Sequence, residues 1–210
     1  MIIDPKFPYR SQIENIDPVF TFTPELRKKA HKFGLDQYQT SKDKYARRGQ
    51  TNPSAIVEQI QTGKITEDMM WLKLSPAISA EISKPDWNIY GAREKNWDSD
   101  LKIYTSPLIR LGVKSQNERS AAEFSTSWIF EYRAGEKYDT DRGVFSEEAK
   151  QPGNFVVFSS IDLRNLTGRL QAILAVSTLH EKKLFEPPVL ERLRDNKLAV
   201  YMKTILEKVK

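Results

Sequence analysis

The feature that most constrains the fold is a pair of apolar segments separated by a short turn in the middle of the chain. The first segment spans residues 100–104 and begins with Asp100, and the second spans residues 108–114 and ends with Lys114. Pro107 lies in the three residues between them. Two apolar runs rich in strand-forming residues and joined by a proline-containing turn predict a β-hairpin.

Helical and strand patterns surround this hairpin. Apolar periodicity, a proline at the first turn and glycine at the end predict three helices before it, at residues 24–33, 53–62 and 64–74. Short apolar runs predict further strands at residues 87–90, 127–132, 155–162, 169–176 and 198–201, and a final helix at 203–209. Early helices, central strands and a last helix are typical of an α/β or α+β protein.

The chain length of 210 residues fits one domain with its own core. Residues 1–23 contain Pro5, Pro8 and Pro18 and little periodicity, so they are predicted to form an extended N-terminal arm rather than a packed element. Such an arm is available to contact a partner subunit.

Composition narrows the possible chemistry. The chain has no cysteine and two histidines, which removes disulfides, cysteine nucleophiles and thiolate zinc sites and leaves a metal ion to oxygen ligands. No apolar run is long enough to cross a bilayer, and the first residues lack the pattern of a secretory signal. We therefore expect a protein of the cytoplasm with no membrane partner.

Positive charge is concentrated near the start of the chain. The formal net charge is +5, while residues 26–50 carry eight lysines or arginines against two aspartates. Lys44, Arg47 and Arg48 belong to this basic segment and are predicted to contact DNA phosphates. The alternative is a solvated helix face and loop, which the same residues would also form.

Four charged residues could form a hydrolytic site. Cutting a phosphodiester with a divalent cation requires carboxylates that hold the ion and a nearby cation that activates the attacking water. Asp100 begins the first strand of the hairpin and Lys114 ends the second, while Asp86 and Glu67 precede them. Adjacent strands can aim an acid and a lysine at one point.

The arrangement Gly-Lys-Ile-Thr-Glu at 63–67, Pro-Asp at 85–86, Asp100 and then Ile-Arg-Leu-Gly-Val-Lys-Ser-Gln at 109–116 resembles the PD-(D/E)XK nuclease superfamily, which includes restriction endonucleases. The likeness covers about residues 63–116. It implies a restriction-endonuclease-like α/β fold, a central mixed β-sheet flanked by helices.

Two alignments with the family motif compete. In one, Asp86 is the leading acid and Asp100-Leu101-Lys102 is the acid-any-lysine element. In the other, which we favour, Asp100 is the leading acid and Gly112-Val113-Lys114 is the second element, because an apolar strand leads into the lysine. A glycine then stands where the family has an acid, and Glu67, Asp86, Glu118 or Glu123 would have to supply the carboxylate.

The resemblance implies a Mg²⁺-dependent endodeoxyribonuclease, with Mn²⁺ as a substitute, of the type II restriction class. It would act on double-stranded DNA as a homodimer. Asp100, Glu67 and Asp86 would hold the metal and Lys114 would activate water, while Gln116 and Lys102 would contact DNA. The alternatives are a non-catalytic nucleic-acid-binding protein of the same fold, or a structural or regulatory α/β protein.

Overall fold

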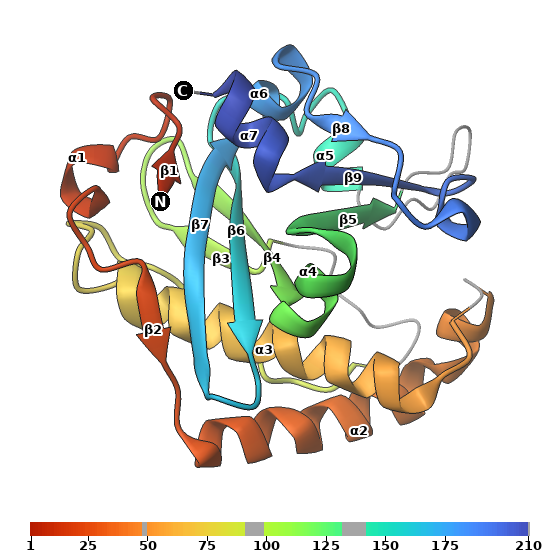
Figure 1. Cartoon of the computed structure of the whole chain (residues 1–210). Helices are drawn as coiled ribbons and strands as arrows, with labels where there is room; N and C mark the ends of the chain where they lie inside the picture. The colour runs from red at the N-terminus through yellow and green to blue at the C-terminus, as the bar shows by residue number, and fades with distance from the viewer. Residues whose placement is uncertain (48–49, 91–98, 132–141, 210) are drawn as a thin grey trace.

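The computed structural model describes residues 1–47, 50–90, 99–131 and 142–209. These residues form a mixed α/β structure in which a mixed central sheet is flanked by helices (Figure 1). Six strands make up the central sheet, in the order β1-β7-β6-β4-β3 with β2 also paired to β7. A second sheet has the order β5-β9-β8.

The strands of the central sheet are β1 (Ile2–Ile3), β2 (Val19–Thr21), β3 (Leu101–Ile103), β4 (Ile109–Asn117), β6 (Asn154–Asp162) and β7 (Thr167–Ala175). The strands of the second sheet are β5 (Ser127–Glu131), β8 (Phe185–Glu186) and β9 (Lys197–Tyr201). The helices are α1 (Arg10–Ile13), α2 (Pro24–Arg47), α3 (Pro53–Leu74), α4 (Glu118–Phe124), α5 (Arg142–Phe145), α6 (Val176–Glu181) and α7 (Met202–Lys208), with a 3-10 turn, η1, at Glu191–Leu193.

The predicted hairpin is confirmed. β3 and β4 pair in antiparallel fashion, with Leu101 opposite Leu111 and Ile103 opposite Ile109. β4 then continues beyond the end of β3 and pairs in parallel with β6 along Arg110 to Asn117. The strands predicted at 127–132, 155–162, 169–176 and 198–201 are present with small shifts of their ends. Residues 87–90 do not form a strand.

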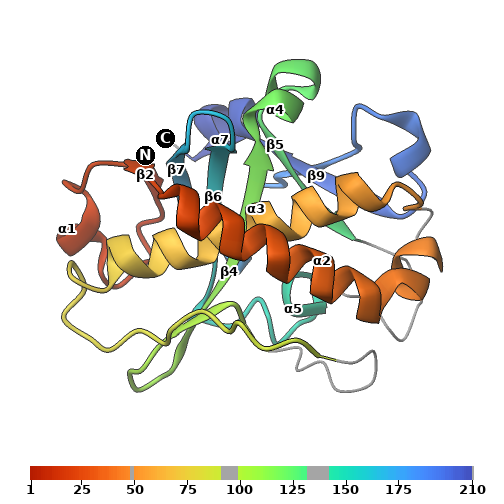
Figure 2. The ribbon, with the colours of Figure 1, turned by 90° about the horizontal axis from the view of Figure 1, so that it is seen from below.

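Helices α2 and α3 pack as an antiparallel pair along one face of the central sheet (Figure 2). Asn52 caps α3 as predicted, because its side chain accepts the N–H of Ala55 at 3.2 Å. Both helices are longer than predicted, and the reason is clear at Gly34. A Cβ there would lie 2.9 Å from the carbonyl oxygen of Val57 on α3, so this glycine permits close contact between the helices and does not end α2.

The second prediction of a helix end, at Gly63, also differs from the structure. Gly63 lies inside α3, which runs unbroken from Pro53 to Leu74. The apolar side of α3, including Ile65 and Met70, packs on the central sheet in one core. A continuous apolar face therefore outweighs the modest cost of a glycine inside a helix.

A separate core lies on the opposite face of the central sheet. Trp128 and Phe130 of β5 pack there against Phe158 of β6, together with residues of α6 and α7. The smaller sheet and the C-terminal helices thus form a layer on this face (Figure 1). The central sheet is covered on both sides.

The N-terminal segment is packed against the protein's own sheet, which differs from the predicted extended arm. β1 pairs in parallel and β2 in antiparallel fashion with β7. Phe7 and Ile13, in the segment that connects β1 to β2, are buried, and Asp4 is 1% exposed. Asp4 accepts the N–H groups of Lys6 and Ala175, each at 2.9 Å. The three prolines weaken the apolar periodicity of this segment. Burial of its apolar side chains nevertheless stabilises its packing on the sheet.

None of the described helices is long and apolar enough to span a membrane.

Candidate active-site cleft

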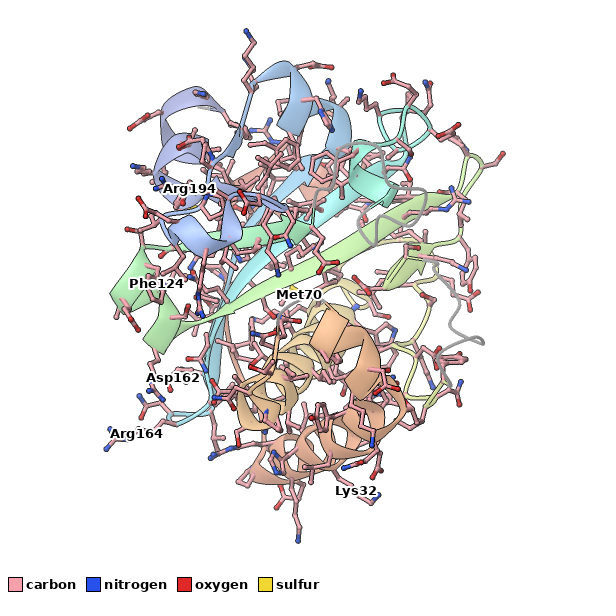
Figure 3. The ribbon with its side chains drawn as sticks, turned by 90° about the vertical axis from the view of Figure 1, so that its right-hand side faces the viewer. Lys32, Met70, Phe124, Asp162, Arg164 and Arg194 are labelled. Atoms are coloured by element: carbon pink, nitrogen blue, oxygen red, sulfur yellow. The ribbon has the colours of Figure 1, made fainter. Side chains whose placement is uncertain are left out.

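A large cleft of about 1560 Å³, lined by both polar and apolar residues, opens beside β4. Its lining comes from the first half of α3, from β4 and α4, from β5, and from the segment around residues 188–197. Figure 3 labels Phe124 on α4 and Arg194 in that last segment, on the same side of the view and above the α2–α3 pair. Small-molecule sites usually have about 300–1,000 Å³, so the cleft is large enough for part of a polymer.

Asp100 lines this cleft immediately before the first residue of β3. Its Oδ2 atom accepts the backbone N–H of Val113 at 2.6 Å, and its side chain is exposed. Along β4, the pairing with β3 ends at Leu111. The Asp100 carboxylate therefore accepts the Val113 N–H in place of a backbone carbonyl from a further residue of β3. Asp100 is thereby held beside the residue that precedes Lys114.

Lys114 lines the same cleft from β4. Its side chain points away from α3, because alternate residues of β4 such as Leu111 pack on the α3 side. The Lys114 ammonium lies 4.7 Å from the centre of the Phe130 ring, within range of a cation–π contact. Asp100 and Lys114, which the favoured alignment pairs, therefore line the same cleft.

Glu67 and Asp86 are placed together, but outside the lining of that cleft. Lys64 donates to the Glu67 carboxylate at 2.5 Å and to the backbone oxygen of Asp86 at 2.7 Å. Glu67 is 9% exposed and lies in the middle of α3 rather than in its first turns. Since α3 packs on the face opposite Lys114, the structure does not bring these two acids to Lys114.

The Asp86 carboxylate is engaged within its own loop. It accepts hydrogen bonds from the backbone and side-chain N–H groups of Asn88 and from the hydroxyl of Tyr90. Partial burial alone would raise the pKa of Asp86, but these hydrogen bonds and the charge of Lys64 hold it below its usual value. The arrangement stabilises an ionised carboxylate that fastens the loop.

Three predicted DNA contacts belong to the basic segment at the end of α2. Lys44 and Arg47 lie in its last turn, but their side chains fall outside the described part of the structure, as does Arg48 entirely. Tyr45 and Gln50 beside them line the cleft. The end of α2 therefore leads to the rim of the cleft.

The two other predicted contacts have different positions. Gln116 lines the cleft and also joins β4 to β5, since its side chain donates to the Ser125 carbonyl at 3.1 Å and accepts the Ser127 N–H at 2.8 Å. Lys102 pairs with Arg110 across β3 and β4 but is not part of the cleft lining. The alternative alignment, which uses Lys102, thus places its lysine outside the cleft.

Several charged residues in the cleft were not identified from the sequence. The acids are Glu58 and Glu131, and the bases are Arg110, Arg119, Arg192 and Lys197. Glu123, one of the residues considered for the missing acid, also lines the cleft, whereas Glu118 does not. Trp128 and Phe130 alternate on one face of their strand, which places Glu131 on the other face. This alternation was the sequence pattern from which Glu131 could have been identified.

Two buried polar atoms of the cleft walls have no hydrogen-bond partner within the part of the chain that is described. They are Oγ1 of Thr62 and Oδ1 of Asn196. An unsatisfied buried polar atom costs about 1–3 kcal/mol, so such atoms are uncommon.

The described residues contain no group of three or more histidine, cysteine, aspartate or glutamate side chains arranged to hold a metal. Mg²⁺ in proteins often retains several waters and is held by one or two carboxylates together with substrate phosphates. Asp100 fits this simpler type of site, which a bound phosphate would complete.

Comparison with protein-family models, curated proteins and solved structures finds no significant match to this chain.

Proposed function

We propose that the protein is a divalent-metal-dependent endodeoxyribonuclease with a restriction-endonuclease-like fold, of the type II class. The observation that carries the proposal is that Asp100, which immediately precedes β3, and Lys114 on β4 line one large cleft. The Asp100 carboxylate accepts the backbone N–H of Val113, the residue before Lys114, at 2.6 Å. An acid and a cation so placed suit hydrolysis of a phosphodiester.

In the proposed reaction each residue has one task. Asp100 holds Mg²⁺, or Mn²⁺ in its place, and the metal when bound would polarise the phosphate and stabilise the leaving oxygen. Lys114 orients and activates the attacking water and stabilises negative charge that develops on the phosphate. Gln116 fastens β4 to the start of β5 through Ser125 and Ser127, and would contact the reacting strand.

Glu67 and Asp86 have a supporting role in this proposal. Through Lys64 they fasten α3 to the loop that leads toward Asp100. Glu123 and Glu131, which line the cleft, are the better candidates for a second carboxylate near the metal.

We expect two copies of the chain to act together, because a two-fold dimer can cut both strands of a symmetric site. Sedimentation of the protein with and without a DNA duplex measures this directly. A dimer on DNA is the expected result, and a monomer under both conditions would contradict it.

The test of activity is cleavage of supercoiled plasmid with Mg²⁺, with Mn²⁺ and with EDTA. The proposal predicts nicked or linear products with either metal, none with EDTA, and none from Asp100→Ala. Full activity of Asp100→Ala would exclude the proposed mechanism.

A non-catalytic nucleic-acid-binding protein is the second candidate, favoured by the lack of a three-acid cluster among the described residues. Tight binding of a DNA duplex by the wild-type protein with no cleavage in either metal would select it.

A further inference from the structure

The floor of the cleft contains a glycine whose presence the protein's own packing does not explain. Gly112 lies inside β4, paired with Val156 of β6. Among the described residues, a Cβ added there would meet only the Phe155 carbonyl oxygen at 3.9 Å, an ordinary contact, and the backbone is not in a conformation that favours glycine. A glycine inside a strand costs stability and often marks close approach of a ligand.

The other described glycines allow a comparison. A Cβ at Gly34 or Gly168 would clash with neighbouring atoms, and Gly153 has a φ of +97° that favours glycine. Gly63 resembles Gly112, because no atom of the described part of the chain lies within 4 Å of its added Cβ, but it is outside the cleft lining. Gly112 therefore stands out as an unneeded glycine inside the cleft.

Two cations frame Gly112 on the same face of β4. Arg110 and Lys114 are two residues away on either side, so their side chains share the face that a Gly112 Cβ would occupy. Alternate residues of a strand are about 6.6 Å apart, so the glycine leaves an opening between the two cations. Both residues and Gly112 line the cleft.

The edge of β4 next to this opening is also accessible. β3 covers β4 only from Ile109 to Leu111, and the Asp100 carboxylate then takes the Val113 N–H. An anion over Gly112 would thus lie between two basic side chains, with the Asp100 carboxylate on one side. That combination suits a phosphate group, and Asp100 would hold the cation that accompanies it.

We propose that Gly112, with Arg110 and Lys114, forms the subsite that receives a phosphate group of a DNA strand. The subsite deepens the proposed function and rests on it for the identity of the polymer. Gly112 has no chemical role of its own: the missing side chain lets the phosphate approach the strand, so Gly112 is a positioning residue.

The test measures DNA binding without turnover. A fluorescent DNA duplex is titrated with protein in EDTA, and its anisotropy is followed at several salt concentrations. Gly112→Ala should weaken binding about tenfold, the loss of one charge-assisted hydrogen bond, without lowering the melting temperature. Gly63→Ala, the matched control, should bind like the wild type.

Arg110→Gln provides an independent variant at the same subsite. The logarithm of the binding constant falls linearly with the logarithm of salt concentration, and loss of one phosphate contact should reduce that slope by about one. Inorganic phosphate is the second probe. If phosphate displaces DNA more strongly than chloride does at equal ionic strength, and Gly112→Ala loses this difference, the subsite accepts any phosphate group. If phosphate competes no better than chloride while Gly112→Ala still weakens DNA binding, the subsite is specific for the phosphate of a polymer.

The subsite is rejected if Gly112→Ala binds DNA as tightly as the wild type, or if the wild type does not bind DNA. Failure of the proposed function has a different signature. If the wild type binds DNA, Gly112→Ala weakens that binding and no cleavage is seen, the subsite stands and the nuclease is excluded. If the wild type cleaves DNA and Gly112→Ala binds DNA as tightly as the wild type, only the subsite is excluded.

Discussion

The carboxylate of Asp100 accepts the backbone N–H of Val113 at 2.6 Å, which holds the start of β3 beside the residue that precedes Lys114. This contact predicts different effects for two substitutions. Asp100→Asn retains an oxygen acceptor, so the melting temperature should stay close to that of the wild type. Plasmid cleavage should nevertheless fall by about a hundredfold or more, because the charge that holds the metal is lost and even indirect metal contacts cost about 10–100-fold.

Asp100→Ala removes both the acceptor and the charge. It should lose cleavage and also show a lower melting temperature than Asp100→Asn. Thermal unfolding of the two variants, followed by circular dichroism, measures the difference. Equal melting temperatures would show that the Val113 contact does not stabilise the hairpin.

Gly34 and Gly63 predict opposite effects of the same substitution. Gly34→Ala forces a Cβ to within 2.9 Å of the Val57 carbonyl and should cost about 1–3 kcal/mol of unfolding free energy. The Cβ of Gly63→Ala meets no atom of the residues that the structure describes within 4 Å, so the substitution should raise the unfolding free energy by about 0.4–1 kcal/mol. Urea unfolding of the two variants is the measurement. A stabilising Gly34→Ala would contradict the described packing of α2 on α3.

Asp4 links the N-terminal segment to the end of β7. Its side chain is buried and accepts the N–H of Ala175, which immediately precedes α6. Asp4→Ala leaves that N–H without its partner and should cost about 1–3 kcal/mol of unfolding free energy. Asp4→Asn, which keeps one oxygen acceptor, should cost less. If chemical denaturation gives the same midpoint for wild type and Asp4→Ala, the segment does not contribute to the folded sheet in this way.

Asp162 predicts a pH-dependent contribution to stability. The backbone N–H of Asn165, with that of Arg164, holds the pKa of this carboxyl below its usual value in the turn after β6. The ionised group therefore stabilises the fold above its usual pKa, and this contribution is lost as the pH falls through the lowered value. Wild type should melt a few degrees above Asp162→Ala at neutral pH, and the gap should close in acid.

Asp162→Asn separates charge from hydrogen bonding, because it keeps an acceptor that does not titrate. The melting temperature of Asp162→Asn should therefore change less with pH than that of the wild type. A gap between wild type and Asp162→Ala that persists unchanged to the most acidic pH would contradict the lowered pKa as its source.

Features set by neighbouring residues were predictable from the sequence. The β3–β4 hairpin follows from two adjacent apolar runs and their turn, and the Asn52 cap follows from the proline that comes next. The placement of Asp100 and Lys114 in one cleft follows from their positions on paired strands.

Features that depend on distant contacts were not predictable in the same way. The reason that α2 passes Gly34 is Val57, which lies on another helix. The burial of the N-terminal segment depends on β7, more than 140 residues later in the chain. Glu131 enters the cleft through the smaller sheet, whose pairing of β5 with β9 is equally remote in sequence.

The central claim is that the protein cleaves DNA in the cleft that Asp100 and Lys114 line. The most direct test measures single-turnover cleavage by Lys114→Gln and by Lys102→Gln at saturating DNA and Mg²⁺. The account predicts that Lys114→Gln loses the cleavage step, while Lys102→Gln weakens DNA binding but cleaves bound DNA. Unchanged cleavage by Lys114→Gln, with loss in Lys102→Gln, would contradict the account and select the other alignment.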